Sequence, residues 1–494
     1  MVLERVTPES VGIHSKGILD FIDLAERRGL ELHSLMLLRH GKVCAEGWWK
    51  PYNPASPHMM FSFTKALTST AVGFAVQEGK LALTDKLCDL FPDKLPENPG
   101  ENLRLCTVRD LLTMTCGHAT EIDTFDVSKP DWIRNFLAHE FKYKPGTCFM
   151  YNTAGTNMLC AALKRRTGED LFEYLTPRLF EPLGISDVEC FRLPDGTEMG
   201  GAGSRLRAED MARFILFVAQ RGRWAGRQLL DAAWFDLATS KAVETLSPVN
   251  DPDTPDWRCG YGFQFWRCVP EHVVRADGAF GQYGVIFEDK DAILILQSAS
   301  ARQQDQLTCA WETILPAITD EKSLPESPMT HVLQHRLKRA EIQPMLSMRN
   351  RASEAQAGGR RFAPAETMPG LADLIGGVWI VAPQGGETKT LRLDFSDDKA
   401  VLTAEQDNGA FSVDIGLESH FVESTLCGRT YGAVGRWRTD TCFEAEIRCA
   451  EAVGGKRMLF EFDGGRLTLT CTSTLPLSGG IADKAPQTYT LAAE

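Results

Sequence analysis

The chain has no apolar run long enough to cross a membrane. Its richest stretch, residues 283–299, is interrupted by the charged letters EDKD, whereas a membrane-spanning helix needs about 20 predominantly apolar residues. The first residues, MVLERVTPESVGIHSKG, also lack the apolar core of an export signal. We therefore predict a cytoplasmic protein that does not use a membrane as a partner.

The chain also lacks positive charge. Its 53 lysines and arginines are outnumbered by 66 acidic residues, which gives a formal net charge of −13. An acidic surface repels phosphate groups, so we do not expect nucleic acid as a partner. The 43% of hydrophobic residues and 24% of charged residues are typical of a globular protein, and 494 residues suffice for several domains.

Metal-binding and nucleotide-binding motifs are missing. The 14 cysteines form no CxxC pair and no zinc-like spacing, so we expect free thiols and no disulfides. The sequence contains no HExxH, no GxSxG and no phosphate-binding loop. His331 and His335 have a spacing that can hold a metal, but no acidic third ligand lies nearby, so a solvated helix is the better interpretation. We predict no metal and no cofactor.

The order of helical and strand patterns indicates an α+β domain over residues 1–320. A helix at 15–29 and a hairpin at 32–49 are followed by mainly helical patterns from 62 to about 240. Strand patterns return with YGFQFWRC, HVVRADG, QYGVIFED and AILILQSA, and a helix at 306–318 follows. Strands at both ends of a helical middle predict one antiparallel sheet flanked by helices, with an inserted helical subdomain.

Residues 321–366 have the composition of a linker, and residues 367–494 are rich in strand patterns. In CFEAEIRC (442–449), apolar and charged residues alternate, which predicts a half-buried strand. In MLFEFDGGRLTLTC, the letters DGG predict a hairpin turn. We expect a small all-β, barrel-like domain.

One serine and lysine pair could supply catalytic chemistry. In FSFTKALTST, Ser62 precedes Lys65 by three residues, so in a helix that begins at Ser62 the two side chains share a face. A serine hydroxyl needs a base to act as a nucleophile, and apolar neighbours would lower the pKa of Lys65. Backbone N–H groups at the helix start would stabilise an oxyanion.

A structural interpretation of the same pair is also open. Ser62 could cap a helix and Lys65 could be a surface lysine whose stem lies along the protein. The spacing recurs once, at Ser396 and Lys399, in the charged turn DFSDDKA, where a surface position is expected. The spacing alone therefore does not distinguish catalysis from structure.

Two further segments favour catalysis. KPGTCFMYNTAGTNML places Tyr151 after a Pro-Gly turn, and RADGAFGQYG is a glycine-rich strand edge. With FSFTKALTS, these segments resemble, in order and separation, the serine β-lactamase and penicillin-binding-protein superfamily, which carries an SxxK signature. The branch that they resemble is class C-like and includes esterases, D-aminopeptidases and 6-aminohexanoate-oligomer hydrolases.

The resemblance implies a role for each matching residue. Ser62 is expected to be the acylated nucleophile, Lys65 its base or proton relay, and Tyr151 a second acid/base group. The backbone N–H groups of Ser62 and Ala279 would form the oxyanion hole. Substrate binding would involve three residues beside these groups, namely Asn152, Thr153 and Gly278. Apart from the resemblance, His58 and His118 are candidates to line the pocket, with a structural role as the alternative for each.

The sequence departs from the family pattern at two positions. Thr153 stands where an amide usually holds the acyl side chain, and Ala276 stands where β-lactamases place a cation that binds the substrate carboxylate. Arg275 should face the opposite side of its strand. Efficient β-lactamase activity is therefore not expected.

We predict a serine hydrolase that cleaves a small-molecule ester or small amide. The alternatives are a D-aminopeptidase or linear amide hydrolase, and a catalytically silent binding relative.

The letters GGVWIV, around Trp379, make the C-terminal domain resemble the lipocalin-like barrels that are appended to members of this branch. Such a barrel would act as a packing or oligomerisation module or as a lid over the active site. The substrate and the oligomeric state are not predicted.

Overall fold

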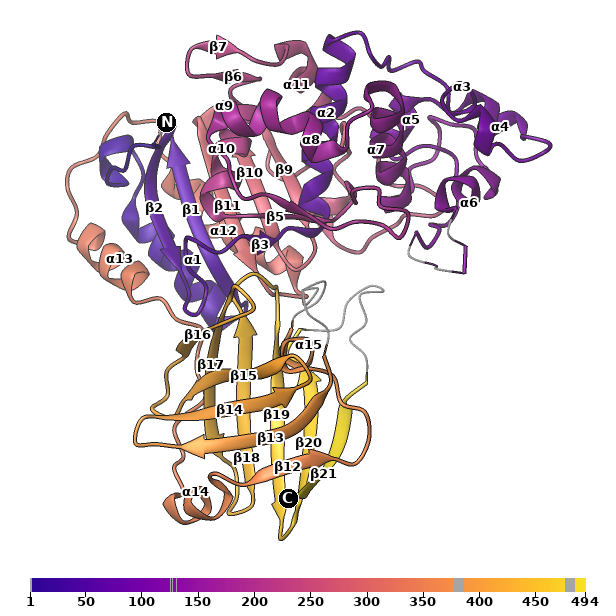
Figure 1. Ribbon diagram of the computed structural model, residues 1–494. Helices are drawn as coiled ribbons and strands as arrows, with labels where there is room; N and C mark the ends of the chain where they lie inside the picture. Colours follow the sequence, from indigo (N-terminus) through magenta and orange to yellow (C-terminus); the bar gives the residue numbers. More distant parts are fainter. Residues whose placement is uncertain (1, 125, 127, 130, 377–385, 476–484) are drawn as a thin grey trace.

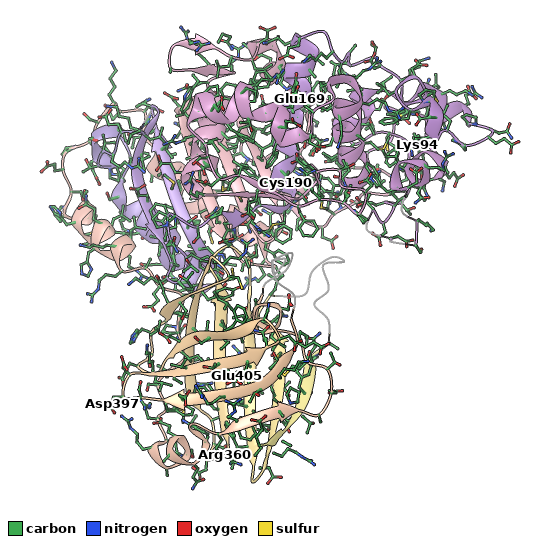
Figure 2. The ribbon with its side chains drawn as sticks, in the orientation of Figure 1. Lys94, Glu169, Cys190, Arg360, Asp397 and Glu405 are labelled. Atoms are coloured by element: carbon green, nitrogen blue, oxygen red, sulfur yellow. The ribbon has the colours of Figure 1, made fainter. Side chains whose placement is uncertain are left out.

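The computed structural model describes residues 2–494 except 125, 127, 130, 377–385 and 476–484. The segment around Trp379 lies outside the described residues. The chain forms an N-terminal α+β domain and a C-terminal barrel, which Figure 1 shows below it. Figure 2 labels Lys94, Glu169 and Cys190 on the N-terminal domain and Arg360, Asp397 and Glu405 on the barrel.

The N-terminal domain is built on the antiparallel sheet that the sequence predicts. Strands from its two ends lie side by side, because Leu35 of the first strand pairs with Leu296 of the last. The order is β2 (Lys42–Trp48), β1 (Leu32–Arg39), β11 (Ala292–Ser298), β10 (Gln282–Phe287), β9 (Val273–Gly278) and β8 (Trp266–Arg267). The YGFQFWRC pattern yields only the two residues of β8, so most of β9 borders the sheet edge.

Both faces of the sheet are buried by helices. Alternate residues of β1, β10 and β11 face α1 (Ser15–Arg27) and α12 (Gln303–Ala317), as the predicted first and last helices require. The other residues of the same strands pack in a second cluster with α2 (Thr64–Gln77) and α10 (Ala208–Ala219). A strand that is covered on both faces carries apolar residues at nearly every position, and all eight residues of β1 are buried.

The helical subdomain is inserted between β2 and β8. It carries α3 (Leu87–Leu90), α4 (Glu101–Leu105), α5 (Val108–Leu112), α6 (Trp132–Ala138), α7 (Thr153–Thr167), α8 (Leu171–Leu175), α9 (Glu181–Leu183) and α11 (Ala232–Ala238). A short sheet in the order β3 (His58–Met59), β5 (Ser204–Leu206), β4 (Glu189–Cys190) joins it to the central sheet. Figure 1 shows α3, α4, α5, α6 and α7 to the right of the central strands.

The predicted linker contains two helices and one short strand. It carries α13 (Pro328–Lys338), which packs on β2, and α14 (Arg351–Ala357). The barrel begins inside the 321–366 segment, at β12 (Arg361–Pro364), because this short strand pairs with β13 and β21.

The C-terminal domain is a closed barrel, as predicted. Its strands are β12, β13 (Thr388–Phe395), β14 (Lys399–Gln406), β15 (Gly409–Gly416), β16 (Val422–Leu426), β17 (Arg429–Trp437), β18 (Cys442–Cys449), β19 (Gly455–Asp463), β20 (Arg466–Ser473) and β21 (Gln487–Ala493), with helix α15 (Leu371–Ile375). Pairing of β15 with β17 closes the ring, and β16 pairs with β17 outside it. The letters DGG form the predicted turn between β19 and β20.

Strand β18 differs from its prediction. Phe443, Ala445 and Ile447 face the barrel core, but the charged face is buried too, with Glu444, Glu446 and Arg448 at 3%, 7% and 4% exposure. Arginines on neighbouring strands pair with the two glutamates, and Glu31 of the N-terminal domain pairs with Arg448. Ion pairing makes burial of these charges tolerable, which the alternating pattern cannot reveal.

Candidate active site

Ser62 lies in a tight turn that leads directly into α2. The 3-10 turn η2 (Phe61–Phe63) precedes the α-helix, which begins at Thr64 and not at Ser62 as predicted. Phe63 occupies the N-cap position and no side chain caps the helix, so Ser62 is not its cap. The hydroxyl is therefore free of the structural role that the sequence left open.

The Lys65 side chain is buried and is not a surface lysine. It is 1% exposed, and its Nζ lies 3.0 Å from Ser62 Oγ, 2.6 Å from the Gly201 carbonyl oxygen and 3.3 Å from Thr153 Oγ1. A neutral amine has two N–H donors and one lone pair. If the two N–H groups point to Gly201 and Thr153, the lone pair faces the Ser62 hydroxyl, which is the geometry of a general base.

The environment of Lys65 favours this neutral form. Burial away from water lowers its pKa to about 7, although Glu121 and Asp277 oppose the shift. A buried ammonium loses its hydration, and the three polar contacts replace it only in part. A lysine with this pKa is partly unprotonated at neutral pH and can accept a proton from serine.

Tyr151 completes the cluster. Its ring stacks on that of Trp266, with 5.5 Å between the centroids, and Lys65 Nζ lies 4.8 Å from the centroid of the Tyr151 ring. Its phenol interacts with the Ser62 side chain, which opposes the rise in the pKa of Tyr151. Burial raises the pKa of Tyr151 above its usual value. The phenol therefore keeps its proton at neutral pH, which suits a donor or relay and not a tyrosinate base.

The backbone N–H groups of Ser62 and Ala279 are the two candidate donors of an oxyanion hole. Within the described residues, no hydrogen bond uses the N–H of Ser62 or of Ala279. Gly278 allows the edge of β9 to approach this segment, because a Cβ at that position would lie 2.1 Å from the Met60 carbonyl oxygen. The glycine-rich motif therefore permits the close approach that an oxyanion hole requires.

The preceding residues of β9 carry a charge pair that sequence reasoning did not assign. Ala276 is 1% exposed and packs in the cluster with α2, while Arg275 lies on the other face, as predicted. Arg275 Nε donates to Asp277 Oδ2 at 2.8 Å, and its guanidinium lies 4.5 Å from the Trp257 ring. Because Arg275 is fully buried and paired with Asp277, β9 presents no exposed cation to a substrate carboxylate.

Asn152 and Thr153 have different roles, because Asn152 caps a helix whereas Thr153 contacts the Ser62 cluster. Asn152 is buried and caps α7, since its Oδ1 accepts from the Gly155 N–H at 2.8 Å. Thr153 is half-buried and contacts Lys65. Glu121, which sequence reasoning missed, accepts the Ala154 N–H at 2.9 Å and so places an exposed carboxylate beside Thr153. No local motif marks Glu121, because a separate loop brings it to the site.

The other candidates lie apart from the Ser62 cluster. His118 is buried behind Asn152, and His58 contacts His33. His331 and His335 are exposed on α13, and no group of three potential metal ligands exists among the described residues. The Ser396 hydroxyl donates to the Lys399 carbonyl oxygen in an exposed turn.

All 14 cysteines are free thiols, and no helix in the described ranges has the length and apolarity of a membrane span.

Comparison with known sequences gives one family model and several curated relatives. The beta-lactamase family model matches residues 22–315. Protein flp of Staphylococcus aureus strain MW2 is 27% identical over 167 residues, which are 30% of this chain and 33% of that protein. Lovastatin esterase of Penicillium rubens is 27% identical over 156 residues, 26% of this chain and 38% of that enzyme. This chain thus spans about one third of the length of these curated relatives.

Comparison with solved structures supports the fold. An octameric penicillin-binding protein homologue from Pyrococcus abyssi is 16% identical, with a TM-score of 0.50. The match covers 96% of this chain and 99% of that homologue. EstCE1, a hydrolase with promiscuous acyltransferase activity, is 18% identical, with a TM-score of 0.50. The match covers 63% of this chain and 99% of EstCE1. At these identities the likeness concerns the fold alone.

Proposed function

The chain belongs to the beta-lactamase family, and from this membership and the Ser62 cluster we propose that it is a serine hydrolase of esters or small amides. The observation that carries the proposal is the position of Lys65, which is buried, has a pKa near neutrality and is 3.0 Å from the Ser62 hydroxyl. A structural lysine needs neither this contact nor this pKa. The substrate is a small molecule and the reaction needs no cofactor.

The reaction begins with attack by serine. Lys65 takes the proton of the Ser62 hydroxyl as the oxygen bonds to the substrate carbonyl carbon. The resulting oxyanion accepts hydrogen bonds from the N–H groups of Ser62 and Ala279. The carbonyl re-forms, the bond to the alcohol or amine breaks, and the leaving group receives a proton through Tyr151, which the Lys65 ammonium replaces.

Water then releases the acid. It attacks the acyl carbon of Ser62 while its proton passes through Tyr151 to the neutral Lys65 amine. The second tetrahedral intermediate then expels the Ser62 oxygen, which takes this proton back from Lys65. The test is the intact mass of the protein after brief exposure to p-nitrophenyl esters and aminoacyl nitroanilides. We expect an acyl adduct on the peptide that contains Ser62. Turnover without any adduct on that peptide would remove the proposed intermediate.

The pH profile should follow Lys65. Since the base is the neutral amine and its pKa is about 7, kcat/KM should rise about tenfold per pH unit in acid and level off above neutrality. No decline is expected up to roughly pH 9, because burial raises the pKa of Tyr151. Initial rates across this range measure the profile. A midpoint near the ordinary lysine value would contradict the assignment.

Glu121→Gln provides the matched control for this profile. The amide keeps an oxygen that can accept the Ala154 N–H but loses the negative charge that stabilises the Lys65 ammonium. The midpoint should therefore move to lower pH. A midpoint that moves upward would show that another group titrates.

Charge at the site should select against carboxylates. The β9 motif offers no free cation, and the Glu121 carboxylate lies beside Thr153. Among p-nitrophenyl esters of matched chain length, those ending in methyl or ammonium should exceed those ending in carboxylate by about tenfold in kcat/KM. Glu121→Gln should narrow this gap. A preference for the carboxylate would contradict the inferred site charge.

Glu121 also favours the second candidate function, hydrolysis of amides that carry a free amino group. An ammonium group bound by this carboxylate would place an aminoacyl substrate near Thr153. Nitroanilides of D- and L-amino acids, compared with their N-acetylated forms, separate the two candidates, since only an aminopeptidase requires the free amine.

A further inference from the structure

A segment of the barrel contacts the strand that leads to Ser62. We call residues 448–454, which end β18 and connect it to β19, the barrel arm. The Met59 N–H donates to the carbonyl oxygen of Glu451 at 3.0 Å. Met59 is the last residue of β3, three positions before Ser62. The barrel thus supplies a backbone partner to the segment that carries the nucleophile.

The arm also packs against the proposed oxyanion hole. Val453 of the arm and Leu475, a barrel residue that follows β20, are 1% and 6% exposed. They form one buried cluster with Phe61 and Phe280, and Ala279 packs against it. The two phenylalanine rings lie 5.5 Å apart. Phe61 directly precedes Ser62 and Phe280 directly follows Ala279. The barrel therefore shares one buried cluster with the chain neighbour of each donor N–H.

These two phenylalanines need support. Phe61 has φ of 46° and Phe280 has φ of 65°, in the left-handed region that bulky residues rarely adopt. Such conformations cost about 1–3 kcal/mol each and persist only when the surroundings enforce them. Val453 and Leu475 are part of those surroundings. Loss of their packing would let the two donor N–H groups relax from their positions.

A buried polar chain ties the arm to the same strand. Arg448 donates to both carboxylate oxygens of Glu31 at 2.6 and 3.1 Å. Glu31 lies 2.9 Å from His33 Nε2, and His33 Nδ1 lies 2.8 Å from Nε2 of His58, the first residue of β3. Both residues of β3 are thus connected to the arm, one directly and one through this chain.

The outer side of the short sheet is fixed as well. The Glu451 carboxylate pairs with Arg429 of the barrel, which also lies 3.5 Å from Glu189 of β4. Glu189 in turn pairs with Arg205 of β5, the central strand beside β3. The contacts of the arm therefore converge on the sheet β3-β5-β4, which leads to the nucleophile.

We propose that the barrel arm is a positioning element that holds the oxyanion-hole N–H groups of Ser62 and Ala279 in their catalytic geometry. This inference rests on the proposed function. It differs from a lid, because a lid alters KM according to substrate size, whereas a support for the oxyanion hole alters kcat for every substrate.

Val453→Ala tests the proposal, with Leu469→Ala as its matched control. Leu469 is fully buried in the barrel core and takes no part in the arm cluster, so its loss weakens the barrel without touching the active site. We expect Val453→Ala to lower kcat about tenfold with KM within about twofold, since small misplacements of catalytic groups are costly. The loss should be equal for p-nitrophenyl acetate and octanoate, and absent in Leu469→Ala.

Rates are counted per active site, titrated with a fluorophosphonate that labels the serine. The affinity for a boronic acid, which forms a tetrahedral adduct on serine, should fall by the same factor as kcat. Val453→Leu is a second variant. It keeps the cluster apolar, but the larger side chain should displace the neighbours of this buried position and so also reduce kcat.

Unchanged kcat per titrated site in both Val453 variants would overturn the inference, as would a loss confined to the octanoate ester, which is the signature of a lid. An equal loss in Leu469→Ala would do so too. Failure of the proposed function is a separate result, because the wild-type protein itself would then take up no fluorophosphonate at Ser62.

Discussion

Replacing Ser62 with alanine should lower kcat for ester hydrolysis by about 10⁴- to 10⁶-fold, the loss found when a nucleophile is removed from an enzyme that works through an acyl intermediate. The variant keeps the backbone N–H at position 62, so any residual rate comes from binding and oxyanion stabilisation. The measurement is steady-state hydrolysis of p-nitrophenyl acetate, together with the intact mass of the protein after exposure to the ester.

Ser69→Ala is the matched control. Ser69 lies on the same helix, is fully buried, and its hydroxyl has no hydrogen-bond partner in the described part of the chain. This variant should keep its activity within about twofold, as a substitution without lost partners usually does. If Ser62→Ala retained wild-type turnover, Ser62 would not be the nucleophile. If the wild-type protein turned over none of the esters, the hydrolase proposal would lose its basis and a binding role would replace it.

Replacing Lys65 with methionine should lower kcat by about 10²- to 10⁴-fold, the usual contribution of a general base. Methionine keeps the apolar packing of the lysine stem but has no lone pair on nitrogen to accept the Ser62 proton. Stopped-flow acylation by p-nitrophenyl acetate measures the step directly. The rise of rate with pH through about 7 should also disappear, because it follows the pKa of Lys65.

Lys65→Arg separates proton transfer from charge. A guanidinium stays protonated in proteins, so arginine can stabilise negative charge but cannot act as a base. We expect this variant to be as slow as the methionine variant. An arginine variant that keeps most of the acylation rate would show that position 65 contributes charge alone. Circular dichroism spectra identical to the wild type would establish that both variants fold.

The features of the site that depend on residues close together in the sequence could be predicted from the sequence. The separation of Ser62 and Lys65 survives the wrong helix start, because a 3-10 turn that continues into α2 still brings residues three apart together. The closing of the sheet by strands from both ends of the domain also follows from the order of apolar patterns. These features depend on periodicity and chain order, which one sequence displays.

Other parts of the site depend on contacts between distant residues. Glu121 reaches the start of α7 from a separate loop, and Val453 reaches Phe61 from another domain. The left-handed backbone at Phe61 has no signature either, because phenylalanine gives no sign of positive φ, as glycine would. The burial of Glu446 and Arg448 likewise needs the three-dimensional partners that neutralise them.

The pairing of β1 with β11 has a consequence for synthesis on the ribosome. Residues 32–39 pair with residues 292–298, so the β1–β2 hairpin emerges long before its partner strand. At about 5–20 residues per second, the roughly 250 intervening residues take about 12–50 s to translate. During that time an apolar strand edge is unpaired, which is a site for aggregation. The nascent chain therefore has a long window in which a chaperone that shields β1 would raise the yield of folded protein.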